Sequence, residues 1–188
     1  MATPKRRADA ERNRDRVLTA ARRLLAERGD EVQLPEIARA AGVGVGTVYR
    51  HFPTRRDLIE AAADTRFAEI ARFAREDCLG RPAALARYLR HVGEVLDSDR
   101  GLSAAVENVR GTAGSAPRDA ARADLEAVVA ELLAQSRAEG EVRDDCTIGD
   151  VYLLAGCLSS VIRTGSGDWR RFLDLAFDGL RPRLSAPE

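Results

Sequence analysis

Residues 45–51 carry hydrogen-bonding side chains at helical spacing, directly after a glycine-rich turn. Thr47 offers a hydroxyl and a methyl group, which suit a phosphate oxygen or the methyl group of thymine. Tyr49 and His51 can donate to phosphate oxygens, and Arg50 can do the same or bind guanine through its forked guanidinium. The chemistry that this set of side chains fits is recognition of duplex DNA.

A short helix must present these side chains, and a second helix must support it. The preceding segment has one apolar face at helical spacing, formed by Ile37, Ala38 and Ala41. Gly42 follows this face, where a left-handed C-cap favours a residue without a Cβ atom. Val48 and Phe52 lie four residues apart and can seat the next helix on the core. The pattern predicts a helix-turn-helix, in which the second helix enters the major groove.

The charge distribution favours this interpretation over an ordinary helical hairpin with a solvated face. The whole chain has no net charge, but residues 1–56 hold 13 Lys and Arg against 7 Asp and Glu, a net charge of +6. The remaining residues 57–188 carry a net charge of −6. Such asymmetry indicates a basic binding face. Lys5, Arg6 and Arg7 form a basic arm ahead of the first predicted helix, and we expect this arm to contact phosphates.

The rest of the sequence predicts an all-α protein of nine helices. The 188 residues are 45% hydrophobic, and helical periodicity recurs between glycine and proline punctuation. The first helix is expected over residues 11–28, and a long fourth helix over residues 54–77. Thr54 with Asp57 and Thr147 with Asp150 have the spacing of capping boxes.

The run Gly-Thr-Val-Tyr-Arg-His-Phe at 46–52, followed by Pro-Thr-Arg-Arg-Asp-Leu, closely resembles the DNA-binding signature of TetR-type transcriptional regulators. The close match covers residues 11–70. It implies a TetR-like fold, with a three-helix DNA-binding domain at 11–70, its motif at 33–52, and a larger ligand-binding and dimerisation domain at 71–188. The residues expected to bind DNA are Gln33, Val45, Gly46, Thr47, Tyr49, Arg50, His51, Arg55, Arg6 and Arg7.

Two positions depart from the family pattern. The family usually has Thr or Ser where Gln33 stands, and Gln is a poor cap, although Glu36 keeps the other half of a capping box. The family often has Ser in place of Gly44, so a hydroxyl that contacts phosphate is missing here. Direct base recognition then depends on Thr47, Tyr49 and Arg50, with DNA shape supplying the rest.

In the family, the C-terminal region encloses a small-molecule site, and its last helices pair in a dimer. The candidate pocket residues here are Phe67, Phe73, Tyr88, His91, Asn108 and Trp169; core packing is the simpler role for each aromatic. The apolar residues expected at a homodimer interface are Val151, Leu154, Leu158, Val161, Ile162, Phe172, Ala176, Phe177 and Leu180. Alternatively, the last two helices simply cross the core of one subunit.

The resemblance implies a homodimeric repressor that a small-molecule effector releases from a palindromic operator. The sequence contains no catalytic constellation, no metal-ligand spacing and no phosphate-binding loop, so we expect no enzyme activity, metal or cofactor. It has no signal peptide or membrane span, which predicts a cytoplasmic protein. Two alternatives stay open: a redox-responsive regulator that uses Cys78 or Cys146, and a ligand-independent regulator. The sequence leaves the sign of regulation and the effector undetermined.

Overall fold

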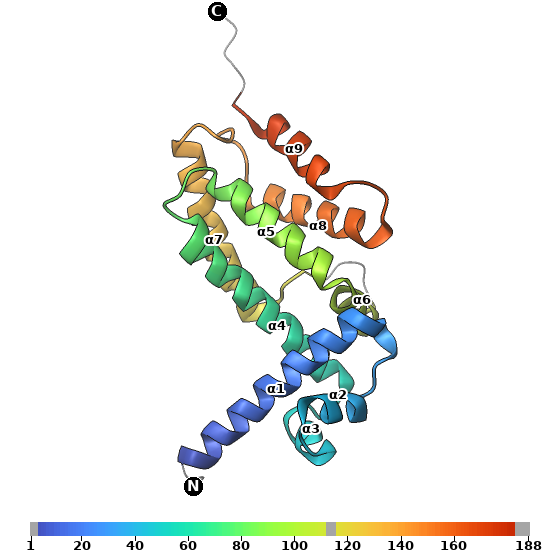
Figure 1. Ribbon diagram of the computed structural model, residues 1–188. Helices are drawn as coiled ribbons and strands as arrows, with labels where there is room; N and C mark the ends of the chain where they lie inside the picture. Colours follow the sequence, from blue (N-terminus) through green and yellow to red (C-terminus); the bar gives the residue numbers. More distant parts are fainter. Residues whose placement is uncertain (1–3, 112–115, 183–188) are drawn as a thin grey trace, which may run out of the picture. The chain divides into compact units, whose positions relative to one another are not determined.

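The computed structural model describes residues 4–111 and 116–182, and in these ranges the chain forms α-helices and no strand. Over these described ranges, the prediction of an all-α protein with nine helices is confirmed. Figure 1 shows how the helices follow one another along the chain. The helices are α1 (Pro4–Arg28), α2 (Leu34–Ala41), α3 (Val45–His51), α4 (Arg55–Phe73), α5 (Ala84–Ser98), α6 (Arg100–Arg110), α7 (Asp119–Ala138), α8 (Ile148–Thr164) and α9 (Trp169–Leu180). A 3-10 turn follows α1, and a π-helical turn, Ala74–Cys78, follows α4.

The chain divides into two compact units, each made of two separate stretches of sequence. The N-terminal unit consists of Met1–Thr65 and Asp99–Ser115, and the C-terminal unit of Arg66–Ser98 and Ala116–Glu188. Helix α4 therefore begins in one unit and ends in the other. Helix α6, which the sequence boundary at residue 70 assigns to the C-terminal domain, belongs to the N-terminal unit.

In the N-terminal unit, α1 packs against α2, α3 and α6. The apolar faces of these helices form the core, which includes the buried residues Val17, Leu18, Ala21, Leu25, Ile37, Ala38, Val48, Phe52, Leu102 and Val106. Their spacing of three and four residues places one side of each helix inward, where burial of the apolar surface stabilises the unit. Helix α2, with its supporting face buried, can then hold the turn to α3.

Polar and close backbone contacts fix α6 to this unit. Asp99, just before α6, accepts a hydrogen bond from Arg22 of α1 at 2.8 Å. At the other end, Arg110 binds Glu60 of α4 through two nitrogens, with Nη2···Oε2 at 2.6 Å, and its side chain is only 2% exposed. Such paired, charge-assisted bonds also satisfy the buried charge.

In the C-terminal unit, α5 packs against α7, α8 and α9. The buried residues come from one stripe of each helix and include Leu85, Leu89, Val92, Val128, Val129, Leu132, Leu158, Ile162, Trp169 and Leu173. Trp169 lies directly over Gly93, where an added Cβ would come within 2.9 Å of the indole ring. Its Nε1–H donates to Asp97 at 3.3 Å. The start of α9 is thereby attached to α5.

The first helix begins at Pro4 rather than at Glu11, so the prediction of a basic arm ahead of it is wrong. The residues before Glu11 include Ala and Arg, which favour a helix, and Pro4 suits the first helical position. Arg6 and Arg7 lie within α1, but their side chains fall outside the described part of the structure, and so does that of Lys5.

Local capping follows the sequence prediction. The Thr147 backbone N–H and hydroxyl both donate to the Asp150 carboxylate, and the Asp150 N–H donates back to the Thr147 hydroxyl. Thr54 and Asp57 make the same set of bonds at the start of α4. Both helix starts are thus fixed by residues three apart in sequence.

Two kinds of feature are absent from the described residues. None of the helices in residues 4–111 and 116–182 is both long and apolar enough to cross a membrane. Over the same ranges, no group of three or more His, Cys, Asp and Glu side chains is arranged to hold a metal ion.

Candidate nucleic-acid interface

The turn between α2 and α3 has the geometry that its glycines predict. Gly42 adopts a left-handed conformation, with φ 63° and ψ 38°. The Val43 N–H donates to the Ala38 carbonyl at 3.0 Å, which closes the end of α2. Gly44 is extended and caps α3, accepting a hydrogen bond from the Thr47 N–H at 2.8 Å. The chain reverses within these few residues, so α3 lies against α2.

Helix α3 is seated by two apolar side chains and exposes the rest. Val48 is fully buried and Phe52, just after the helix, is 2% exposed, as predicted. By contrast, Val45 and Tyr49 are 39% and 48% exposed, although large apolar side chains are normally covered. The other predicted contact residues on α3 are exposed or half-buried: Gly46 and Arg50 are exposed, and Thr47 and His51 are half-buried. The outer face of α3 can therefore reach a groove.

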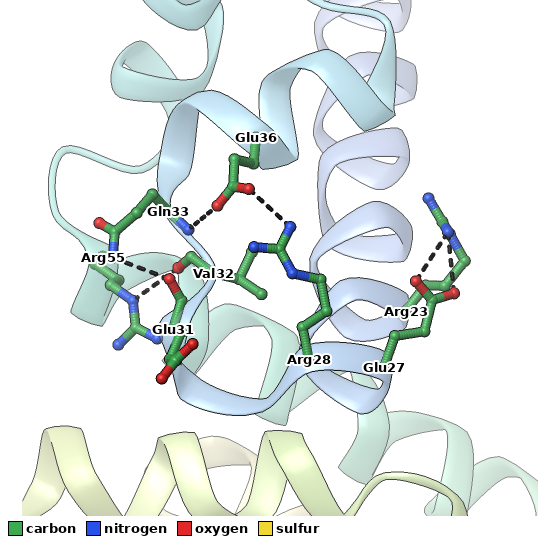
Figure 2. Close-up of polar contacts among 8 residues, drawn as sticks. All are labelled: Arg23, Glu27, Arg28, Glu31, Val32, Gln33, Glu36 and Arg55. Atoms are coloured by element: carbon green, nitrogen blue, oxygen red, sulfur yellow. Dashed lines mark hydrogen bonds and ion pairs between the residues drawn. The ribbon is translucent and has the colours of Figure 1, made fainter.

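A polar network holds the start of α2 (Figure 2). Glu36 accepts a hydrogen bond from the Gln33 N–H at 3.0 Å and one from Arg28 at 2.7 Å. These hydrogen bonds lower the pKa of the Glu36 carboxyl group, because they stabilise its charged form. The Gln33 side-chain amide donates to the Glu31 carbonyl at 3.1 Å. The half of the capping box that depends on Glu36 is present, as predicted.

Two predicted DNA contacts lie beside this network. Gln33 is exposed at the start of α2. Arg55, at the start of α4, is half-buried, and its Nε–H donates to the Val32 carbonyl at 3.4 Å (Figure 2). Arg55 thus contacts the backbone just before α2, a bond that its place in the sequence does not reveal.

Helix α1 adds two arginines that were not among the predicted site residues. Arg16 Nη2 donates to the Gly42 carbonyl oxygen at 3.1 Å. The Arg14 guanidinium carbon lies 5.5 Å from the centre of the Phe52 ring, within the range of a cation–π contact. Arg14 and Arg16 lie on the exposed side of α1, where sequence periodicity predicts only contact with solvent.

The predicted pocket residues are divided between the two units. Asn108 is an exposed residue of α6 in the N-terminal unit, and the other five lie in the C-terminal unit. Phe67 and Tyr88 are buried, and burial raises the pKa of the Tyr88 phenol. Trp169 packs on Gly93, so it has the core-packing role that was the simpler expectation for each aromatic residue.

Phe73 and His91 are the two predicted pocket residues that form a ring contact. Their ring centroids are 3.7 Å apart and their planes are inclined by 16°. Both are half-buried, and removal of the His91 imidazole from water lowers its pKa. The neutral imidazole, which is favoured, can both donate and accept a hydrogen bond.

The predicted dimer residues fall into two groups. Val151, Leu158 and Ile162 are buried within the C-terminal unit, so they pack inward in the single chain. The other six residues are half-buried: Leu154, Val161, Phe172, Ala176, Phe177 and Leu180. Leu153 and Leu175 were not among the predicted residues, and they are 65% and 54% exposed. Helix α8 is apolar nearly all round, and this was the signal that could have identified Leu153.

The cysteines have the environment of structural thiols. Cys78 and Cys146 are buried, Cys157 is half-buried, and all three are free. Burial raises the pKa of the Cys78 and Cys146 thiols, because it disfavours the charged thiolate. The thiolate is the reactive form, so these surroundings disfavour the redox-responsive alternative.

Comparisons with known proteins agree with this geometry. Residues 17–62 match the family model described as bacterial regulatory proteins, tetR family, and residues 82–182 match the model described as the C-terminal domain of SbtR-like transcriptional regulators. Among curated proteins, an HTH-type transcriptional regulator of Staphylococcus aureus is 42% identical over 65 residues. That match spans 33% of this chain and 34% of the relative, about a third of each.

Solved structures extend the similarity to nearly the whole chain. A TetR transcription regulatory protein from Mycobacterium vanbaalenii is 38% identical, with a TM-score of 0.67, and the match covers 93% of this chain and 98% of that one. A TetR transcriptional regulator from Streptomyces coelicolor is 34% identical, with a TM-score of 0.66 and coverage of 91% and 99%. RolR in complex with the ligand resorcinol is 27% identical, with a TM-score of 0.57 and coverage of 92% and 89%.

Proposed function

Because this chain belongs to the TetR family of DNA-binding transcriptional regulators, we propose that it acts as a homodimeric repressor that a small-molecule effector releases from a palindromic operator. Members of this family are regulators rather than enzymes. The observation that carries the proposal is the outer face of α3, which exposes Val45 and Tyr49 beside polar and basic side chains. The site of action is then the cytoplasm, where chromosomal DNA lies.

In the proposed complex, α3 lies in the major groove. Val45 and Gly46 at its N-terminal end come nearest to the base edges, as in other helix-turn-helix proteins. Thr47, Tyr49 and Arg50 supply hydrogen bonds to bases and phosphates. His51 and the side chains of Gln33, Arg55, Arg6 and Arg7 are assigned to the sugar-phosphate backbone.

The homodimer is proposed from the surface of α8 and α9. Leu153 and Leu175 expose more than half of their side-chain surface, and half-buried Phe172 and Phe177 belong to the same pair of helices. A second copy of this surface would cover these side chains in a two-fold arrangement. Two recognition helices then read two half-sites, which explains how such a small module obtains useful specificity.

The effector site is proposed in the C-terminal unit. The stacked rings of Phe73 and His91 offer an apolar surface next to a hydrogen-bonding imidazole, a combination that suits a small, partly polar molecule. The relative RolR was solved with resorcinol, a ligand of this kind. Release requires the effector to bind more tightly to a state in which the recognition helices no longer match the half-site spacing.

The test begins with selection of bound duplexes from a random library, followed by gel-shift titration at fixed salt. We expect a palindromic consensus, and we expect Tyr49→Ala to weaken operator binding about tenfold or more. Tyr49→Phe isolates the contribution of the hydroxyl group. Arg23→Ala is the matched control, because Arg23 is an exposed α1 residue paired with Glu27 at 3.0 Å and should leave binding unchanged.

Three results would contradict parts of the proposal. Binding that is indifferent to sequence and to Tyr49→Ala would contradict recognition by α3. An asymmetric consensus with a single half-site would contradict the dimer. A compound screen, started with resorcinol, in which no molecule releases the selected operator would favour a ligand-independent regulator.

A further inference from the structure

Helix α3 is too short to set its own orientation. It spans seven residues, Val45–His51, and Val48 is its one buried residue. A helix of two turns is unstable by itself in water. A single buried valine, with Phe52 at the C-terminal end, anchors the helix but leaves its rotation about that contact weakly determined. Neighbouring groups must therefore fix the angle at which its outer face meets DNA.

The two arginines of α1 described above contact residues on either side of α3: Gly42 in the turn before it and Phe52 directly after it. Before the helix, the Arg16 guanidinium donates to the Gly42 carbonyl at 3.1 Å. After it, the Arg14 guanidinium lies 5.5 Å from the Phe52 ring centre. Arg16 Nη1 also lies 3.5 Å from the Asn13 Oδ1, which steadies the side chain from its own helix.

The contact at Gly42 depends on the absence of a side chain there. A Cβ atom on Gly42 would lie 2.7 Å from Arg16 Nη2. The guanidinium therefore occupies the space directly over the turn. Because Gly42 already has φ 63°, the same glycine permits both the left-handed turn and the approach of Arg16.

We propose that Arg16, assisted by Arg14, is a positioning residue for operator recognition: it fixes the turn, and hence α3, to α1. This inference rests on the proposed function, in which α3 reads the operator. The competing role for an exposed arginine beside a DNA-reading helix is a direct phosphate contact. The two roles predict different binding behaviour, because phosphate contacts act on all DNA and release counterions.

The experiment compares wild type with Arg16→Lys and Arg16→Ala, using the selected operator and a scrambled duplex over a range of salt concentrations. Lysine keeps the positive charge but is shorter and lacks the planar fork that reaches the Gly42 carbonyl. We expect both variants to lose operator affinity about three- to tenfold. Affinity for scrambled DNA and the salt dependence of Arg16→Lys should stay as in wild type. Arg23→Lys and Arg23→Ala are the matched controls.

The inference is overturned if Arg16→Lys matches wild type while Arg16→Ala weakens operator and scrambled DNA equally, with a salt slope smaller by about 0.9. Unchanged operator binding in Arg16→Ala also overturns it. If Arg16→Ala fails to fold, Arg16→Lys decides, with hydrogen exchange of the α3 amides as a second measurement. Faster exchange in α3 with α6 unchanged supports the inference, and unchanged exchange in α3 overturns it. Failure of Tyr49→Ala to affect the operator would instead show that the proposed function itself is wrong.

Discussion

At the level of single residues, the surroundings of His91 determine the protonation state of its imidazole. His91 stacks on Phe73, and its partial burial lowers the pKa of the imidazole, although Glu94 and Asp77 act in the opposite direction. The folded state therefore favours the neutral form more than the unfolded chain does. In a neutral state the ring can offer one donor and one acceptor to a bound molecule.

This shift predicts acid-sensitive stability. A group with a lowered folded-state pKa binds a proton more readily in the unfolded chain, so the free energy of unfolding falls as the pH drops below about 6.5. We expect His91→Gln to reduce this loss between about pH 7 and pH 5. Fluorescence of Trp169, the only tryptophan, reports unfolding of the same unit.

The second histidine provides the control. His51→Gln changes a residue of the N-terminal unit and should leave the pH dependence of the Trp169 signal as in wild type. Equal pH slopes for wild type and His91→Gln would mean that His91 is not responsible for the acid sensitivity.

Among the elements, α6 is the one whose role depends most on packing. It follows α5 after a single residue, yet it is part of the N-terminal unit. Gly101 lies so close to α1 that an added Cβ would come within 2.6 Å of the Leu25 carbonyl carbon. Asp99 and Arg110 hold the two ends of the helix through ion pairs. Helix α6 is thus a structural part of the DNA-binding unit.

We expect Gly101→Ala to lower the free energy of unfolding by about 1–3 kcal/mol, because the added Cβ would collide with backbone atoms of Leu25, which cannot rotate away. Thermal unfolding followed by circular dichroism measures the effect. Gly46→Ala is the matched control, because it adds a Cβ to α3 with no atom within 4 Å and should stabilise the helix by up to about 1 kcal/mol. A wild-type melting temperature for Gly101→Ala would show that α6 can move away from α1 at little cost.

At the scale of the whole molecule, the exposed large apolar side chains of the described residues mark the two surfaces proposed to bind partners. Val45 and Tyr49 lie on α3, and Leu153 and Leu175 lie on α8 and α9. Exposed apolar groups of this size favour contact with a partner. The first pair is assigned to DNA and the second pair to another copy of the chain.

We expect Leu153→Asp and Leu175→Asp to shift the protein from dimer to monomer, since each substitution places a charge in the proposed interface twice, once per subunit. The loss should be about 2 kcal/mol or more for each copy. Sedimentation velocity measures the change, and operator affinity should fall with it. Ala130→Asp, at an exposed position of α7, is the control. Dimers that persist in both leucine variants would place the interface on a different surface.

Local signals in the sequence were enough to predict the helices and the turn that presents α3. The Gly42 C-cap, the Thr147–Asp150 capping box and the seating of α3 by Val48 and Phe52 depend on residues no more than a few positions apart. Their geometry is determined by backbone hydrogen bonding and by the helical repeat, which act over one or two turns. The exposure of the α3 side chains that are proposed to contact DNA was therefore predictable.

Only the tertiary structure showed which faces of the different helices contact one another. Gly101 contacts Leu25, Trp169 packs on Gly93, and these partners lie more than 70 positions apart in sequence. The sequence of α8 does not show which side of the helix faces inward, because the helix is apolar nearly all round. Its neighbours in the fold determine which side is buried. Contacts of exposed arginines, such as Arg16 with Gly42, likewise depend on where two helices cross, and helical periodicity carries no information about that crossing.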